Sequence, residues 1–519
     1  MSKTTIIVGS GVAAVAVSRS LLTENTTAKV VILEAGENFQ PGVNRQRAWV
    51  DFVTTRTPPT MRYQDKAEDA DINANSIFDL VGGRLIVKGG STNHWGGWSL
   101  RMKPEDFRLG DARPGALNWE ISYDDLEEFY HKAELFLDVR GDSNTTSVPR
   151  KGKKYPQKPL PYTALDGLLI PTLKSLGANA YEPLPLARHA WCVTSGTCRF
   201  CPVGARYEAA ADLDKLVVEF NSRVQVIVGA PVISIDMKDK KTAVGVTYIN
   251  RSTGKKEQLL GDRVVVASGT IESPKILQAS TSTFWPRGIG NDTDHVGRYL
   301  VTHPLLSAYG RIENNTERLE QEVDFPTMAS RFFDTPQYQK GGKMFFVRDG
   351  KYIVMKPAEK LIEGVSPDEI NAHIASKTRM ELRALIEAFP APQNRVTVAN
   401  GGGATGTGLP RSKIDYAEHP DTATARVAHM ERLRDILYKA GLKPADPGPP
   451  SRSRADHSTG TCRMSSSAAT GVVDKNLCVH DTENIYVASN AVFPNSGAVN
   501  PTLTLVALSL RLGKHLAKS

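Results

Sequence analysis

The chain has 519 residues, of which 40% are hydrophobic and 23% are charged, as in an ordinary soluble protein. A chain of this length can bury a large core without disulfides or structural metals, and it is long enough for several domain-sized units. The net charge of +8 comes from 64 basic and 56 acidic residues without a lysine- or arginine-rich run, which argues against nucleic-acid binding.

The number of cysteines and the length of the apolar runs indicate in which cellular compartment the protein lies. Five cysteines in a long chain are typical of a reducing compartment rather than of a disulfide framework. The first residues lack the pattern of a signal peptide, and no uninterrupted apolar run approaches the ~20 residues that span a bilayer. We therefore expect a cytoplasmic protein with no membrane partner.

The chain opens with a strand–helix–strand unit. Residues 4–8 are a β-branched run of the kind buried in parallel sheets, and residues 12–22 have helical spacing. Residues 30–33 form a second apolar run, which completes one βαβ unit.

A glycine-rich motif, Gly9-x-Gly11-x-x-Ala14, lies between the first strand and the helix. Its first glycine permits a tight turn, the second lets the backbone approach a pyrophosphate, and the small third residue lets helix and strand pack closely. Glu34 lies 23 residues past Gly11, where a carboxylate binds ribose hydroxyls and disfavours the 2′-phosphate of NADP. The motif predicts dinucleotide binding, but it does not separate FAD from NAD.

Further elements follow along the chain. Amphipathic spacing predicts helices at 122–137, 378–388, 423–440 and from about residue 501 to the end. Apolar or alternating runs predict strands at 84–87, 224–228, 232–237, 243–250, 263–267 and 485–488. Residues 143–162, which are rich in lysine and proline, are predicted to form a connecting loop.

Five segments carry the most specific pattern. Residues 457–464 (His-Ser-Thr-Gly-Thr-Cys-Arg-Met), 484–494 and 500–508 resemble, in this order, the C-terminal signature of the glucose–methanol–choline (GMC) oxidoreductases. Residues 89–97 (Gly-Gly-Ser-Thr-Asn-His-Trp-Gly-Gly) resemble the loop that lies along the flavin in that family, and residues 264–274 resemble its strand-to-helix return segment. The chain is thus similar to this family at both ends and in the middle.

The resemblance implies an α/β fold with two domains. One is a discontinuous, Rossmann-like FAD-binding domain, and the other is an α+β substrate domain with an antiparallel sheet. The FAD-binding domain is expected to comprise residues 1–110, 190–302 and 452–519, and the substrate domain residues 111–189 and 303–451.

The resemblance also implies an activity. His457 would accept the hydroxyl proton of an alcohol while the flavin N5 takes the hydride, and Asn500 would hydrogen-bond the same oxygen. The pairing of His457 with Asn500 is similar to the pyranose oxidase and glycoside 3-oxidase branch, as are residues 390–396. We therefore expect an FAD-dependent oxidoreductase acting on a primary or secondary alcohol of a sugar or glycoside, with oxygen, a quinone or another electron acceptor. Two alternatives stay open: a GMC dehydrogenase acting on a non-sugar alcohol, and a flavin-containing lyase that resembles hydroxynitrile lyase.

The residues expected to bind FAD come from all of these motifs. They are Gly9, Gly11, Ala14, Glu34, Gly90, Ser91, Asn93, His94, Val232, Asn490, Pro501 and Thr502. In pyranose oxidase a histidine at the place of His94 carries the flavin covalently, but the Ser-Thr-Asn-His-Trp order here differs, and noncovalent FAD is expected. His303, in Thr302-His303-Pro304, is interpreted as a packing residue.

The spacing Cys192-x5-Cys198-x2-Cys201 followed by proline is open to three interpretations. Related flavoproteins have a similar turn that packs over the cofactor. Three clustered cysteines are also typical of iron–sulfur ligands, and His189 lies near enough in sequence to join a zinc site. The loop without metal is favoured, so no metal site is predicted.

Overall fold

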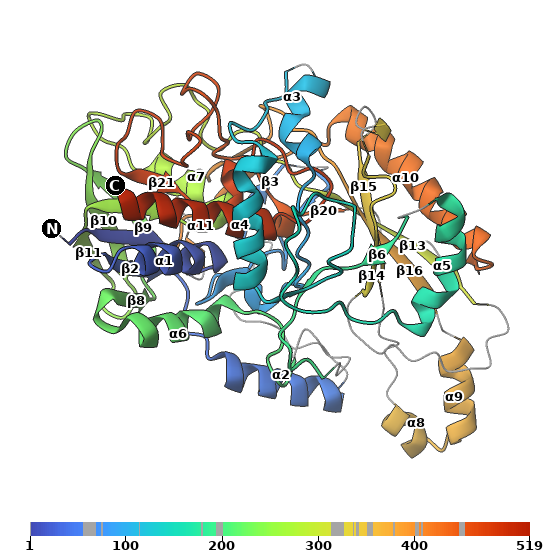
Figure 1. Cartoon of the computed structure of the whole chain (residues 1–519). Coiled ribbons are helices and arrows are strands. Elements are labelled where there is room, and N and C mark those ends of the chain that lie inside the picture. The colour runs from blue at the N-terminus through green and yellow to red at the C-terminus, as the bar shows by residue number, and fades with distance from the viewer. Residues whose placement is uncertain are drawn as a thin grey trace.

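The structure is a computed structural model with two adjoining regions (Figure 1). A parallel sheet lies beside both chain termini, and a large antiparallel sheet lies on the other side of the molecule. The structure describes residues 2–55, 69–73, 76–113, 115–177, 180–193, 201–312, 326–335, 337–338, 342–349, 357–376, 379–399, 404–405, 408–445 and 452–519.

The first region is built on a five-stranded parallel sheet with the order β21-β12-β1-β2-β8. The strands are β1 (Thr4–Val8), β2 (Lys29–Glu34), β8 (Val224–Val228), β12 (Arg263–Val266) and β21 (Ile485–Val487). The central strand β1 and its neighbour β12 are almost entirely buried, which explains their β-branched sequences. Helices α1 (Val12–Glu24) and α11 (Thr502–Lys518) pack against each other, so the first and last helices of the chain lie side by side (Figure 1).

A second, antiparallel sheet completes this region. Its strands are β9 (Val232–Met237), β10 (Ala243–Asn250) and β11 (Lys255–Leu260). Helix α7 (Gly269–Ala279) follows β12 directly and packs against β9. Helix α6 (Ala209–Phe220) contacts α1 from the side of β8.

The second region is built on an eight-stranded sheet with the order β4-β20-β13-β16-β15-β14-β6, in which β19 also pairs with β13. The strands are β4 (Phe78–Asp79), β6 (Glu182–Pro183), β13 (Pro304–Arg311), β14 (Met328–Ser330), β15 (Met344–Asp349), β16 (Arg379–Ile386), β19 (Lys443–Pro444) and β20 (Arg452–Arg454). Helices α10 (Pro420–Lys439) and α5 (Ala164–Leu176) contact each other beside this sheet, and α10 packs on β13 and β16 (Figure 1).

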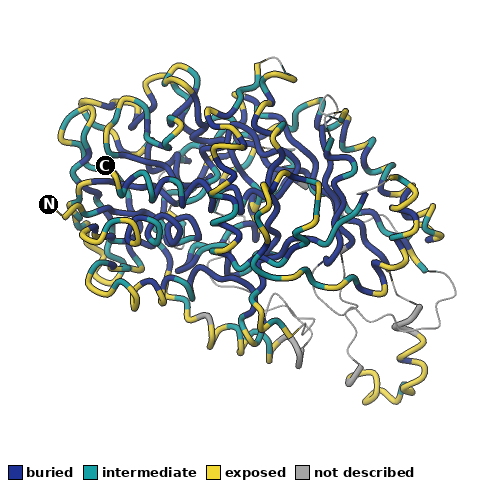
Figure 2. Tube along the Cα trace, in the orientation of Figure 1, coloured by how far each residue is buried: buried dark blue, intermediate teal, exposed yellow. Residues whose placement is uncertain are grey.

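The remaining strands and α-helices lie outside these three sheets. They are the strands β3 (Ala70–Ile72), β17 (Arg395–Val398) and β18 (Ser412–Asp415), the pair β5 (Val139–Arg140) and β7 (Leu186–Ala187), and the helices α2 (Pro41–Thr55), α3 (Leu109–Ala112), α4 (Tyr123–Phe136), α8 (Pro357–Ile362) and α9 (Pro367–Ser376). Buried residues fill the interior of both regions, whereas the described part of α8 and α9 is largely exposed (Figure 2). Among the residues that the structure describes, no helix is both long and apolar enough to cross a bilayer.

The predicted fold class is confirmed, and most predicted elements agree with the structure. Helix α4, for example, begins after Ser122, whose hydroxyl accepts from the Asp125 N–H as the N-cap. Two predictions are wrong. Residues 378–388 were predicted to be helical, but the structure has strand β16 there, between β13 and β15. Residues 84–87 were predicted to be a strand, but they form only isolated bridges, such as the one from Val87 to Glu37.

The division into domains stays a prediction. Strands β4 and β20 pair with each other in the large antiparallel sheet. Both come from segments that were predicted to belong to the FAD-binding domain, 1–110 and 452–519. These two segments therefore reach into the second region at the place where the two regions meet.

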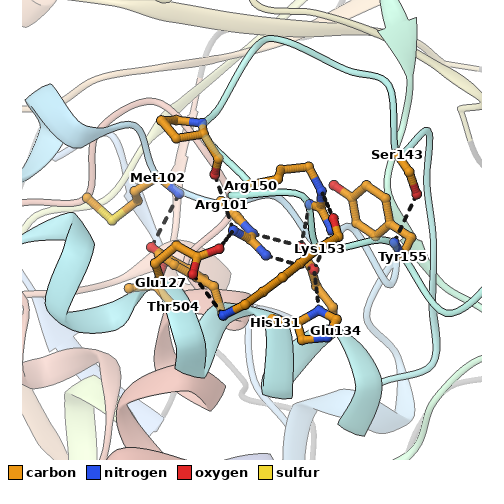
Figure 3. A network of polar contacts seen from close by, with 12 residues as sticks. Arg101, Met102, Glu127, His131, Glu134, Ser143, Arg150, Lys153, Tyr155 and Thr504 are labelled. Carbon is orange, nitrogen blue, oxygen red and sulfur yellow. Dashed lines mark hydrogen bonds and ion pairs between the residues drawn. The ribbon is translucent and has the colours of Figure 1, made fainter.

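A buried network of charges fixes helix α4 next to helix α11 (Figure 3). The Glu134 carboxylate accepts from two nitrogens of Arg101, at 2.8 and 2.9 Å, and from two nitrogens of Arg150, at 2.8 and 2.7 Å. The Arg101 guanidinium also lies 5.5 Å from the ring centre of Tyr130. The Tyr130 hydroxyl in turn shares a 2.8 Å hydrogen bond with the Thr504 hydroxyl in the first turn of α11. The network thus supports the N-terminal end of α11, which carries predicted site residues.

Candidate active site

The glycine-rich turn before α1 has the geometry that the sequence predicts. Gly9 has a φ of 100°, and a Cβ there would lie 2.7 Å from the carbonyl oxygen of Ala267, so only glycine fits. At Gly11, by contrast, a Cβ would meet no atom within 4 Å. Ala14 is fully buried where α1 meets the sheet. No side chain caps α1 and its first turn has no acidic residue, so its N–H groups are open to a phosphate.

Glu34 links this turn to the loop of residues 89–97. One carboxylate oxygen accepts from the Ser10 N–H at 3.0 Å and the Ser10 hydroxyl at 2.5 Å, and the other accepts from the Gly36 N–H at 2.8 Å. The Ser10 hydroxyl accepts in turn from the Gly89 N–H at 3.0 Å. A carboxylate has about four acceptor positions, so these three bonds leave room for a ribose hydroxyl.

The loop of residues 89–97 lies against the same turn. A Cβ at Gly90 would come within 3.4 Å of the Cα of Gly11. The Asn93 side chain donates to the Gly90 carbonyl oxygen at 3.0 Å, and its own Oδ1 is buried with no hydrogen-bond partner among the described residues. Ser91 accepts a backbone N–H at 3.2 Å, and His94 ends the short helix Gly90–Asn93. An acceptor without a partner beside the dinucleotide turn fits a loop that covers a cofactor.

Four more predicted cofactor-binding residues come from other segments. Helix α11 begins after Pro501, at Thr502, with neither a capping side chain nor an acidic residue in its first turn. The Oδ1 of Asn490 is buried and also lacks a hydrogen-bond partner among the described residues. Val232 begins β9 and is buried. The open N-terminus of α11 and the unpaired amide oxygen of Asn490 are groups that a bound flavin would satisfy.

The predicted catalytic pair is brought together in the structure. Asn500 Nδ2 lies 2.9 Å from His457 Nε2. The pairing of β13 with β20 places a second histidine, His303, beside this pair. Its Nδ1 lies 3.3 Å from Nδ1 of His457, and its Nε2 lies 3.0 Å from the carbonyl oxygen of Gly497. Both ring nitrogens of His457 therefore have a defined neighbour.

Electrostatics keep these two imidazoles neutral. Burial lowers the pKa of His457 below its usual value, the Asp456 carboxylate offsets part of this effect, and Arg454 lowers the pKa further. Burial, together with His457, lowers the pKa of His303 to about 3. A neutral imidazole near pH 7 can accept a proton, which is the property that a general base needs.

His303 is the residue whose position the sequence did not predict. It is buried, as a packing residue would be, and it also contacts His457. Thr302-His303-Pro304 lies 154 residues before His457, and nothing in the local pattern indicates the contact. The local sequence offers one weak indication of a role for His303, namely a histidine next to a proline at the start of a strand.

The cysteine segment is only partly described. Cys198 lies outside the described residues, and Cys192 and Cys201 are free thiols. His189, the other proposed zinc ligand, shares a 2.9 Å hydrogen bond with Asp138. Among the described residues, no group of three or more His, Cys, Asp or Glu is arranged to hold a metal ion. The three interpretations of the cysteine spacing therefore stay open.

A parallel sheet that carries a dinucleotide turn, beside a large antiparallel sheet, is typical of an oxidoreductase that binds a dinucleotide cofactor. The chain belongs to the GMC oxidoreductase family, which it matches over residues 5–305 and again over residues 390–509. Its cofactor is therefore FAD, and it is an enzyme that oxidises alcohol groups.

Three relatives and one solved structure illustrate the similarity. The large subunit of fructose dehydrogenase from Gluconobacter japonicus is 25% identical, covering 98% of this chain and 97% of the relative. The 2-methyl-1,2-propanediol dehydrogenase from Mycolicibacterium austroafricanum is 24% identical, covering 99% of this chain and 95% of the relative. Paromamine 6′-oxidase from Streptomyces fradiae is 29% identical, covering 83% of this chain and 78% of the relative. The crystal structure of pyridoxine 4-oxidase from Mesorbium loti superposes with a TM-score of 0.69 at 18% identity, over 99% of both chains.

Proposed function

We propose that this chain oxidises a primary or secondary hydroxyl group of a sugar or glycoside, with His457 as the base. The observation that carries the proposal is the 2.9 Å contact between His457 Nε2 and Asn500 Nδ2, directly before the open N-terminus of α11. The pair presents one proton acceptor and one amide group at the same point. An alcohol needs both when its hydroxyl proton and its hydride leave together.

Each residue of the pair has a distinct role. His457 accepts the hydroxyl proton at Nε2, while bound FAD supplies the ring that takes the hydride. Asn500 donates from Nδ2 to the same oxygen and orients it, and its Oδ1 has no partner among the described residues and is available to a substrate hydroxyl. Pro501 and Thr502 begin α11, whose N-terminal N–H groups have no capping side chain and would stabilise negative charge on bound FAD.

The cofactor is held by the residues that the sequence predicts. Gly9, Gly11 and Ala14 admit the pyrophosphate to the N-terminus of α1, and Glu34 accepts from the ribose. Gly90, Ser91, Asn93, His94, Val232 and Asn490 complete the contacts. We propose noncovalent binding, with FAD-binding segments 1–110, 190–302 and 452–519.

The substrate class is supported by two of the relatives. Fructose and paromamine, which the names of those two relatives contain, carry several hydroxyl groups. A second candidate is a non-sugar alcohol, which the propanediol dehydrogenase favours because it matches nearly the whole chain.

The test is anaerobic mixing of the FAD-loaded protein with fructose, methyl glycosides, paromamine and 2-methyl-1,2-propanediol. Reduction bleaches the flavin absorbance near ~450 nm. Bleaching by the sugars or glycosides supports the proposal, and bleaching by the diol alone supports the second candidate. Admitting oxygen afterwards distinguishes an oxidase from a dehydrogenase. An intact flavin spectrum with every compound would contradict both candidates and leave the lyase reaction.

A further inference from the structure

We propose that His303 is a positioning residue, which holds His457 in the one neutral tautomer whose Nε2 carries no hydrogen and can accept a proton. The inference rests on the proposed role of His457 as the base. It assigns to His303 a function beyond packing, and it is argued from the hydrogen-bond partners of the two imidazole rings.

The first step is the tautomer of His303. The ring is 2% exposed, and its Nε2 lies 3.0 Å from the carbonyl oxygen of Gly497 and 3.0 Å from the hydroxyl of Ser496. A carbonyl oxygen only accepts hydrogen bonds, so Nε2 of His303 must carry a hydrogen. Because a pKa of about 3 keeps the ring neutral, its Nδ1 has no hydrogen and acts as an acceptor.

The Gly497 carbonyl that sets this tautomer is itself held in place. Gly497 has a φ of 54°, and a Cβ there would lie 2.9 Å from the carboxylate carbon of Asp106. The backbone at this point therefore needs glycine and packs directly against Asp106. The acceptor for His303 is thus part of a tightly packed turn just before Asn500.

The second step is the tautomer of His457. Its Nδ1 lies 3.3 Å from the bare Nδ1 of His303, and the two rings meet edge to face, at 79°. Two unprotonated nitrogens at this distance would repel each other, so Nδ1 of His457 carries a hydrogen and donates it to His303. A neutral ring with hydrogen on Nδ1 has a bare Nε2. That nitrogen faces the amide hydrogen of Asn500 at 2.9 Å, so both neighbours of His457 favour the same tautomer.

The consequence is a base that is ready before the substrate binds. Without a partner at Nδ1, a neutral imidazole exchanges between two tautomers, and the one with hydrogen on Nε2 cannot accept the hydroxyl proton. Once His457 is protonated, the hydrogen bond to His303 becomes charge-assisted and stronger. Asp456 and Arg454 are the other charged groups that affect the pKa of His457, and His94 affects Asp456.

The direct test needs no substrate. The FAD-loaded full-length protein is labelled with ¹⁵N at histidine, and long-range ¹H–¹⁵N spectra are recorded at pH 8, where protonated and bare ring nitrogens have separate shifts. The His457 signals are assigned by their loss in His457→Gln. The proposal predicts a protonated Nδ1 and a bare Nε2 for His457. Hydrogen on Nε2 would overturn it.

Two variants separate positioning from packing. His303→Leu fills the space without an acceptor, so it should populate the Nε2–H tautomer of His457 and lower the pKa of His457 by about one unit. His303→Asn places an amide oxygen near the position of Nδ1, so it should restore the wild-type tautomer. Because Asn500 favours the same tautomer, His303→Leu is also compared in an Asn500→Ala background. An unchanged tautomer of His457 in that double variant would overturn the proposal. Undiminished flavin reduction by His457→Ala would instead refute the proposed function, so the two failures are distinguishable.

Discussion

Replacing Glu134 by glutamine removes a carboxylate that accepts hydrogen bonds from two buried arginines (Figure 3). The side chains of Glu134 and Arg101 are 0% exposed, and that of Arg150 is 5% exposed. Glutamine keeps the size of the side chain but leaves the guanidinium groups without their shared counter-charge. Breaking a buried ion pair in this way costs about 3–5 kcal/mol.

The cost converts into a measurable change in melting temperature. Unfolding entropy is about 2.1 cal/mol/K per residue. For a chain of 519 residues that unfolds together, the loss therefore lowers Tm by about 3–5 °C. Differential scanning fluorimetry of the FAD-loaded protein at pH 7 measures this shift.

Helix α4 also offers a matched control. Glu128 pairs with Lys132 at 2.8 Å, but their side chains are 57% and 41% exposed, and such surface pairs contribute only about 0–1 kcal/mol. Glu128→Gln should therefore change Tm by less than about 1 °C. Equal shifts in the two variants, or a Glu134→Gln protein as stable as the wild type, would refute the reasoning from burial.

Four further variants test other parts of the structure. Gly11→Val should give a folded protein, by circular dichroism, because a Cβ at this position meets no atom of the chain within 4 Å. The protein should purify without flavin absorbance, because the added side chain would occupy the space that the pyrophosphate needs. Gly9→Ala should instead lower Tm, because its Cβ would lie 2.7 Å from a carbonyl oxygen; a flavin-loaded Gly11→Val protein would contradict this account. Asn500→Ala should keep FAD but slow anaerobic flavin reduction roughly 10- to 100-fold, the effect of one lost hydrogen bond to a charged group; an unchanged rate would contradict its orienting role. Burial lowers the pKa of His429 to about 4, so this ring is neutral when folded and binds a proton on unfolding below about pH 6.5. The free energy of unfolding therefore decreases as pH falls. Measured by urea unfolding, this free energy should decrease by about 3 kcal/mol more between pH 8 and pH 4 in the wild type than in His429→Gln. Parallel curves of unfolding free energy against pH for the two proteins would argue against this.

The parts of the fold that depend on neighbouring residues could be predicted from the sequence. One local unit is formed by the turn at Gly9 and Gly11, the helix after it and the strand that ends at Glu34. The conformation of each part follows from residues close to it in sequence. The same holds for α11, which begins at Thr502 directly after a proline. In both cases the sequence motif and the spacing of the apolar residues predict the same element, and the structure contains it.

Strand β16 shows where local patterns mislead. Its sequence, Arg-Met-Glu-Leu-Arg-Ala-Leu-Ile, is rich in residues that favour helices, and its spacing suggests an amphipathic one. In the structure it pairs with β13 on one side and β15 on the other. The hydrogen bonds of two distant strands and burial of both faces outweigh intrinsic helix propensity.

The contact between His303 and His457 is a similar case at the site. The motif around His457 and Asn500 predicted these two residues as a catalytic pair, but the partner at the other ring nitrogen of His457 directly precedes strand β13, 154 residues earlier. The pairing of β13 with β20 and the bridge between Val301 and Thr459 bring the two rings together. The loop of residues 89–97 meets the turn at Gly11 in the same way, through tertiary packing.

The most direct test of the central claim is the rate of anaerobic flavin reduction by a reducing alcohol in wild type and in His457→Ala, as a function of pH. The wild-type rate should rise with pH through the lowered pKa of His457, below about 6.5, because only the neutral ring accepts a proton. His457→Ala should retain FAD, lose this pH dependence and react about 10²- to 10⁴-fold more slowly. A variant that reduces its flavin at the wild-type rate with the wild-type pH profile would show that His457 is not the base.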